Sequence, residues 1–119
     1  MNRNCTVLKT ANFIGKRWTM LILLELYKGQ DQWKRYTHLK GKLPDITPKM
    51  LSARLKELER EGMISRRIDA RMFPIKAEYS LTDGGKDFVR ILRDIKKWSL
   101  KWKYRSRHCE SRDCKTCKF

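Results

Sequence analysis

Residues 47–62 of the 119-residue chain read TPKMLSARLKELEREG, and this stretch decides the fold. Thr47 is a good N-cap, Pro48 suits the first helical position and Gly62 is a typical C-cap, so the stretch predicts one helix with both ends marked. The apolar residues within it recur at the helical period: Met50, Leu51, Leu55 and Leu58. One face of this helix is therefore expected to be buried, and the opposite face to be exposed.

A second, shorter helix is expected directly before this stretch. Tyr36, Leu39 and Leu43 lie at helical spacing, and Pro44 ends the pattern. Two helices joined by a short turn form a helix-turn-helix, whose second helix enters the major groove of DNA in proteins that use the motif.

After Gly62 the hydrophobic period changes from 3.6 to 2. Met63, Ile64 and Ile68 predict one strand, while Ala77, Tyr79 and Leu81 alternate in a second strand. A polar loop, residues 69–74, separates them. A two-stranded ribbon that follows a helix-turn-helix is a wing.

Three further helices are expected, over residues 5–14, 18–27 and 82–103. The middle one is apolar nearly all round, which predicts the central core helix. The last has an apolar stripe wider than a small monomer needs, which indicates a dimer interface between terminal helices. The residues assigned to it are Val7, Leu8, Phe88, Leu92, Ile95, Trp98 and Trp102.

The predicted fold class is therefore mainly α with a small β-wing, a winged helix-turn-helix that dimerises through its terminal helices. Residues 1–104 are expected to form the DNA-binding domain. Residues 105–119 are expected to form a basic, cysteine-containing tail that is either loose or tied down by its cysteines.

The charge balance predicts a polyanionic partner. Lys and Arg number 29 against 13 Asp and Glu, so the net charge is +16, while 40% of the residues are hydrophobic, as in a folded domain. Double-stranded DNA is the first candidate, and an anionic membrane surface the second. The chain shows no membrane span, no secretory signal and no catalytic motif, so we expect a cytoplasmic protein that is not an enzyme.

The residues expected to contact DNA lie on the exposed face of the second helix, on the wing and at the start of the first helix. Advancing 100° per residue from Leu51 places the exposed face opposite it. Ala53 would suit a thymine methyl group, and basic wing residues suit phosphates. The full set is Arg35, Tyr36, Thr47, Lys49, Ser52, Ala53, Lys56, Arg67, Arg71 and Lys76. An ordinary solvated helix face is the alternative interpretation of this pattern.

A family resemblance supports the first interpretation. Residues 14–23, IGKRWTMLIL, closely resemble the IGGKWTLLIL signature of HxlR-type transcriptional regulators, which are winged-helix proteins related to the MarR group. The likeness continues in order through RYTHL at residues 35–39, ITPKMLSARLKEL at residues 46–58, EGMI at residues 61–64 and AEYSLT at residues 77–82. It implies a homodimer that binds a palindromic operator to repress or activate transcription. It also implies that Cys5 stands where thiol-sensing members carry their N-terminal cysteine.

The cysteines suggest two further roles. Cys5 is expected at a helix N-terminus in a positive field, where a thiolate is favoured, which makes it a candidate redox-sensing thiol. Its alternative is a small packed hydrophobe. Cys109, Cys114 and Cys117 have ligand-like spacing beside His108, so zinc is a candidate cofactor. An iron–sulfur site, a redox-active thiol group and an unstructured tail stay open as alternatives.

Two other functional classes compete with the sequence-specific regulator. A non-specific architectural nucleic-acid-binding protein would also explain the charge of +16. A metal or thiol redox protein would explain the cysteines, although the sequence shows no substrate pocket or general base.

Overall fold

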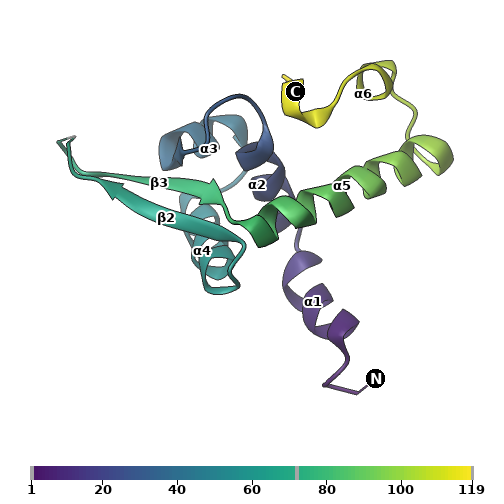
Figure 1. The fold of residues 1–119 in the computed structure, drawn as a ribbon, viewed down its shortest axis with the longest axis horizontal. Helices are drawn as coiled ribbons and strands as arrows, with labels where there is room; N and C mark the ends of the chain where they lie inside the picture. Colours follow the sequence, from purple (N-terminus) through teal and green to yellow (C-terminus); the bar gives the residue numbers. More distant parts are fainter. Residues whose placement is uncertain (1, 72, 119) are drawn as a thin grey trace.

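A computed structural model describes residues 2–71 and 73–118 of the chain. In chain order the elements (Figure 1) are α1 (Thr6–Ile14), α2 (Arg17–Tyr27), β1 (Lys34–Arg35), α3 (Tyr36–Lys42), α4 (Pro48–Arg60), β2 (Ile64–Asp69), β3 (Lys76–Leu81), α5 (Asp83–Trp102), α6 (Arg107–Ser111) and the 3-10 helix η1 (Cys114–Thr116). The helices and the wing predicted from the sequence are confirmed.

The ends of α4 form as the sequence predicts. The Thr47 hydroxyl accepts a hydrogen bond of 3.1 Å from the backbone N–H of Met50. At the other end, Gly62 has φ of +76°, which glycine adopts without strain. Its N–H donates to the carbonyl of Glu59, and the N–H of Met63 donates to that of Leu58. This pair of hydrogen bonds is a Schellman motif, and it turns the chain directly into the wing.

The sheet corrects the two-stranded prediction. β2 and β3 pair antiparallel from Ile64 opposite Leu81 to Asp69 opposite Lys76, and β1 adds a third strand on the other side of β3. A strand of only two residues has no hydrophobic period to detect. Its pairing depends on backbone contacts with a segment more than forty positions along the chain.

The core surrounds α2. Ile22 and Leu23 are fully buried, as the prediction of a central helix requires. The residues packed with them come from α3, α4, the sheet and α5: Leu39, Leu51, Leu55, Leu58, Ile64, Tyr79 and Val89. The helix-turn-helix, the wing and α5 therefore share one core, which holds α4 and the wing in a constant relative position.

A buried lysine joins the end of α2 to the sheet. The Lys34 ammonium donates to the backbone carbonyls of Glu25, at 2.5 Å, and of Lys28. A cation at this place stabilises the unpaired carbonyls at the C-terminus of a helix. Burial lowers the pKa of Lys34, and the carboxylate of Glu25 opposes that shift.

The start of α5 is packed against the end of α4. The Thr82 hydroxyl donates to the carbonyl of Gly62 at 2.6 Å and accepts from the N–H of Gly85 at 3.1 Å. A Cβ atom at Gly85 would lie 2.2 Å from the carbonyl oxygen of Met63, so only glycine permits this approach. The long helix therefore starts at a defined place on the winged body.

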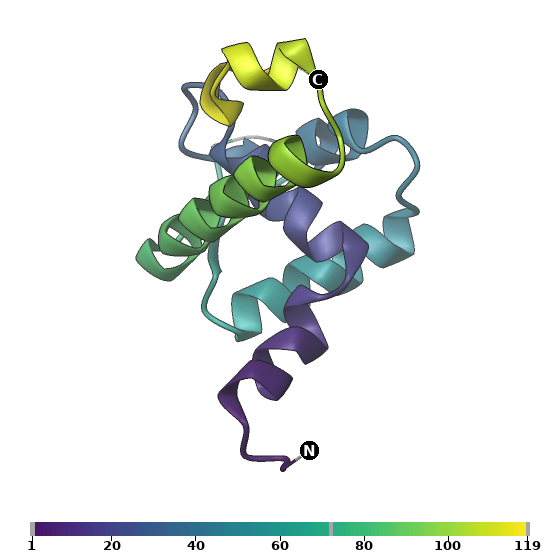
Figure 2. The same cartoon turned by 90° about the vertical axis from the view of Figure 1, so that its right-hand side faces the viewer.

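The C-terminal segment folds back over the body (Figure 2). The N–H of Gly29 donates to the carbonyl of Lys115 at 2.8 Å, and Arg93 on α5 forms an ion pair of 3.3 Å with Asp113. Charged side chains and a backbone hydrogen bond thus hold the tail against the body. Among the described residues, no helix has the length and apolar content needed to cross a bilayer.

Candidate nucleic-acid interface

α4 presents a continuous polar face to solvent. Leu51, Leu55 and Leu58 are buried on the inner side. The outer side carries Lys49, Ala53, Lys56 and Arg60, all exposed, with Ser52 half-buried on the flank. Small residues at positions 52 and 53 leave room for a close approach of the helix to another surface, and the lysines on either side supply positive charge.

A half-buried carboxylate, that of Glu57, links α4 to the start of α2. Lys16, which precedes α2, donates to both carboxylate oxygens of Glu57 at 3.0 Å, and Arg54 donates to the same carboxylate at 2.6 Å. Glu57 thus carries two ion pairs, one with Arg54 on the same helix and one with Lys16 that joins α4 to the start of α2. Sequence reasoning missed this brace, since Lys16 and Glu57 lie 41 positions apart.

The start of α3 lies beside the start of α4. The Tyr36 hydroxyl donates to the carbonyl of Pro48 at 3.2 Å, which joins the two helices at their N-termini. Thr47, the cap of α4, is exposed next to this contact. Tyr36 therefore has a structural role in addition to the DNA contact predicted for it.

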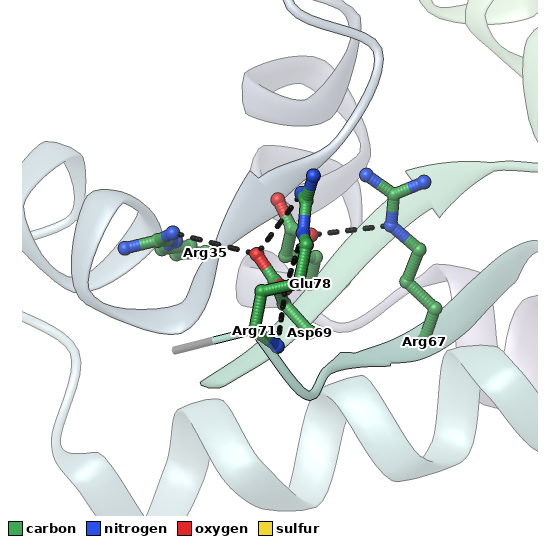
Figure 3. Close-up of polar contacts among 5 residues, drawn as sticks. All are labelled: Arg35, Arg67, Asp69, Arg71 and Glu78. Carbon is green, nitrogen blue, oxygen red and sulfur yellow. Dashed lines mark hydrogen bonds and ion pairs between the residues drawn. The ribbon is translucent and has the colours of Figure 1, made fainter. Parts of the chain in front are cut away.

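Two carboxylates hold three of the basic residues near the wing (Figure 3). Asp69 forms ion pairs with Arg71, at 3.1 Å, and with Arg35, at 3.8 Å. The hydrogen bonds from Arg71 are the main reason that the pKa of Asp69 lies below its usual range, and the same contact raises the pKa of Arg71. The Arg71 side chain nevertheless stays 87% exposed. It is therefore oriented by Asp69 and still open to solvent.

Arg67 is more firmly held than the sequence indicated. Its Nε donates to Glu78 at 3.1 Å, and its guanidinium lies 4.2 Å from the centre of the Trp33 ring. This stacking fixes the loop before β1 against the wing. Its neighbour Arg66 is exposed on β2, whereas Lys76 on β3 is half-buried.

The predicted dimer residues fall into two groups. Phe88 and Leu92 pack against the core of the single chain, and Leu8 is half-buried. The others are exposed, along with Ile91: Val7, Ile95, Trp98 and Trp102. Ile91, Ile95, Trp98 and Trp102 form an apolar row along α5 that the winged body leaves uncovered, and Val7 is exposed on α1.

The cysteines lie at opposite ends of the molecule. Cys5 is the N-cap residue of α1, and Figures 1 and 2 both show the start of α1 at the far end from α6 and η1. Cys5 therefore lies apart from the C-terminal cysteines within one chain. Among the described residues no disulfide bond joins the four cysteines, and all four are half-buried.

The C-terminal cysteines are not gathered as ligands. The Sγ of Cys117 lies 3.5 Å from Nε2 of His108, but Cys109 belongs to α6 and Cys114 begins η1 beyond an extended link. Within residues 2–71 and 73–118, no three Cys, His, Asp or Glu side chains converge on a metal-sized site. The zinc site stays a prediction without a preformed set of ligands.

Comparison with known proteins identifies the protein family to which this chain belongs. A family model described as HxlR-like helix-turn-helix matches residues 13–107. The HTH-type transcriptional regulator YvaP of Bacillus subtilis is 39% identical over 94 residues, which cover 79% of this chain and 83% of YvaP. YdzF, another such regulator of B. subtilis, is 43% identical over 91 residues, covering 76% of this chain and 81% of YdzF.

Solved structures agree with the family model. The reduced form of the regulator YodB from B. subtilis superposes with a TM-score of 0.70 at 31% identity, over 92% of this chain and 98% of that one. The oxidised form of the redox regulator HypR gives a TM-score of 0.70 at 32% identity, over 82% of this chain and 96% of that one. The chain therefore belongs to the HxlR-like helix-turn-helix family and is a DNA-binding transcriptional regulator of the winged-helix type, not an enzyme.

Proposed function

We propose that the protein is a homodimeric, thiol-responsive regulator, most simply a repressor, that binds a palindromic operator in the cytoplasm. The observation that carries the proposal is the exposed face of α4, held beside a basic wing by one shared core. A rigid helix with a free polar face and a flanking wing is suited to place the helix in a major groove and the wing beside it.

The proposed DNA-contacting residues fall into two groups, those placed to contact bases and those placed to contact the phosphate backbone. Lys49, Ser52, Ala53 and Lys56 on α4 are placed to contact base edges, whereas Arg35, Tyr36 and Thr47 surround the N-termini of α3 and α4, where a phosphate backbone would pass. On the wing, the Arg71 side chain is 87% exposed, and Arg67 and Lys76 lie on the two strands that lead to it. Phosphate contacts of this kind orient the protein on the duplex without selecting a sequence.

A homodimer explains the uncovered apolar row. Ile95, Trp98 and Trp102 on α5 are exposed, and α5 extends from the winged body (Figure 1). Pairing two such helices would bury the row and set two copies of α4 at a defined spacing. A palindromic operator matches this symmetry, with half-sites about 34–36 Å apart.

A thiol switch is supported by the position of Cys5 and by the relatives. YodB has been solved in reduced, diamide-treated and quinone-bound forms, and HypR in oxidised and reduced forms. Cys5 is the N-cap residue of α1 and is half-buried. We propose that it pairs with Cys5 of the other subunit, or with a C-terminal cysteine of that subunit. Two thiols then lose two protons and two electrons to the oxidant and form one S–S bond, which shifts one subunit against the other.

The second candidate is an architectural protein that coats DNA without reading it, which the net charge of +16 favours. Selection from a random DNA pool, with the purified protein reduced and then oxidised, separates the two. A regulator should enrich one palindrome and bind it at least about 1,000-fold more tightly than random duplex. An unenriched pool would identify the architectural protein.

A further inference from the structure

The tip of the wing carries a large apolar side chain in water. Phe73 is 98% exposed, more than any other large hydrophobic residue in the part of the chain that the structure describes. Pro74 and Ile75 follow it and are exposed too, as is Ile68 on the facing strand. Charged or polar residues would be the ordinary choice for a solvated hairpin tip, so this composition indicates a partner.

The hairpin is ordered by pairing and hydrogen bonds as far as Arg71. β2 and β3 stay paired as far as Asp69 and Lys76, and beyond that point Asp69 accepts hydrogen bonds from both the backbone N–H and the Nε of Arg71. Residues 69–71, on the β2 side of the tip, are therefore held by these hydrogen bonds.

The proposed dimer contact does not cover Phe73. In Figure 1 the tip of the hairpin projects to one side of the molecule, while the far end of α5 projects to the other. Phe73 also lies outside the core cluster. Its partner is therefore neither the core nor the second subunit at α5.

The charges around the tip identify the class of partner. The hairpin between positions 66 and 76 carries Arg66, Arg67, Arg71 and Lys76 against the single acidic residue Asp69. An apolar point flanked by cations complements a surface with an apolar interior between two rows of anions. The minor groove of duplex DNA is such a surface, since the stacked bases lie between two phosphate backbones.

We infer that Phe73 is a DNA-bending wedge, which enters the minor groove beside the site of α4 and partly unstacks one base step. The inference rests on the proposed DNA-binding function and adds a mechanism to it. Apolar side chains that act in this way bend the duplex toward the major groove by about 20–90°. Pyrimidine–purine steps unstack most readily, so the wing would select them through deformation, without a hydrogen bond to a base.

The test uses the full-length protein and duplexes of about 40 base pairs recovered by selection, long enough for two half-sites with flanks. Donor and acceptor dyes at the two ends report bending, and 2-aminopurine at single flanking positions reports unstacking. The variants are Phe73→Ser and Phe73→Leu, which respectively remove and keep an apolar wedge. Tyr104→Ser is the matched control, because it removes another exposed aromatic ring, beyond the end of α5. Phe73 makes no core contact, so all the variants should fold, and thermal melts verify this.

The wedge predicts that wild type, Phe73→Leu and Tyr104→Ser bend the duplex and raise 2-aminopurine emission at one flanking step. Phe73→Ser should lose both signals and bind about 10-fold more weakly, while still selecting the same central bases. If Phe73→Ser and the wild type gave equal bending and equal emission, the wedge proposal would be wrong, and a protein partner would be the remaining explanation for the exposed Phe73. Failure of the wild type to bind any duplex would instead overturn the proposed function itself.

Discussion

Asp69 and Arg71 are joined twice through one oxygen: Oδ1 of Asp69 lies 3.1 Å from both the backbone nitrogen and the Nε of Arg71. The arrangement turns the guanidinium of Arg71 toward the carboxylate while leaving most of the side chain in solvent. A phosphate that binds Arg71 must therefore compete with Asp69. Part of the positive charge of the wing is thus already paired with Asp69 within the protein.

Replacing this carboxylate should strengthen DNA binding. Asp69→Asn removes a negative charge from the wing and releases Arg71 and Arg35. We expect higher affinity for all duplexes and a salt dependence steeper by up to about 0.9 in the log–log slope, the contribution of one more phosphate contact. Titrations at several salt concentrations measure both. Asp87→Asn, which breaks the ion pair of Asp87 with Arg90 on α5, is the control that should change neither. If Asp69→Asn bound DNA more weakly than the wild type, then the orientation that Asp69 gives to Arg71 would matter more for DNA binding than the negative charge of Asp69.

The same pair predicts how the stability of the wing depends on pH. The folded-state pKa of Asp69 is lower than its unfolded value, about 3.9. The stabilisation of the folded wing by the Asp69–Arg71 contact is therefore complete above the unfolded-state pKa of Asp69. It is lost as the pH falls through the folded-state pKa. Carboxyl NMR should show Asp69 titrating below the usual range of an aspartate. Amide exchange near residues 69 and 71 should accelerate in acid. In Arg71→Ala, which lacks the contact, exchange at these positions should not change with pH in this way. An unshifted titration would contradict the contact.

Helix and wing substitutions should have different effects. Lys49→Ala or Ser52→Ala should change the preferred bases, at a cost of about 1–3 kcal/mol for the operator if a base contact is lost. Arg71→Ala should weaken binding to all sequences about equally, because a phosphate contact carries little base information. Lys103→Ala, beyond the end of α5, controls for the loss of one charge. If Arg71→Ala altered the preferred sequence and Lys49→Ala did not, the docking of helix and wing would be wrong.

Breaking the apolar row on α5 should give monomers. Trp98 is 55% exposed within that row, and a carboxylate there would be buried in any dimer that uses it. Sedimentation equilibrium should show Trp98→Glu as a monomer with an unchanged far-UV spectrum, and with weak binding to a two-site operator. Lys97→Glu, at the preceding position on the helix and also exposed, should stay dimeric. An intact Trp98→Glu dimer would assign the interface elsewhere.

Cys5 should carry the response to oxidants. Operator affinity of wild type and of Cys5→Ser is compared with and without a mild thiol oxidant or a quinone. We expect a change for the wild type alone, reversed by a dithiol. A triple Cys→Ser variant at positions 109, 114 and 117 identifies the second thiol, because it keeps the response only if two Cys5 residues pair. An equal shift in wild type and Cys5→Ser would exclude Cys5 as the sensor.

Local patterns were enough to predict most elements. The capping residues Thr47 and Thr82, the glycine at 62 and the change of period after it define α4, the wing and α5 within a few positions. These signals act through neighbours on the same helix or strand, so they are present in the sequence itself. The outer face of α4 followed from its helical period in the same way.

The tertiary structure alone decided which charges are available and which are structural. The sequence determined that this is a basic winged helix, with lysines on α4 and arginines on the wing. It did not reveal that Glu57 braces α4, that Lys34 is buried beneath the end of α2, or that Arg67 stacks on Trp33. Each of these contacts joins segments that are separate in the sequence, and an ion pair or a stacked ring leaves no periodic trace along the chain. Composition sets how many charges the protein has, but only the packing of distant segments determines which of them remain free to contact DNA.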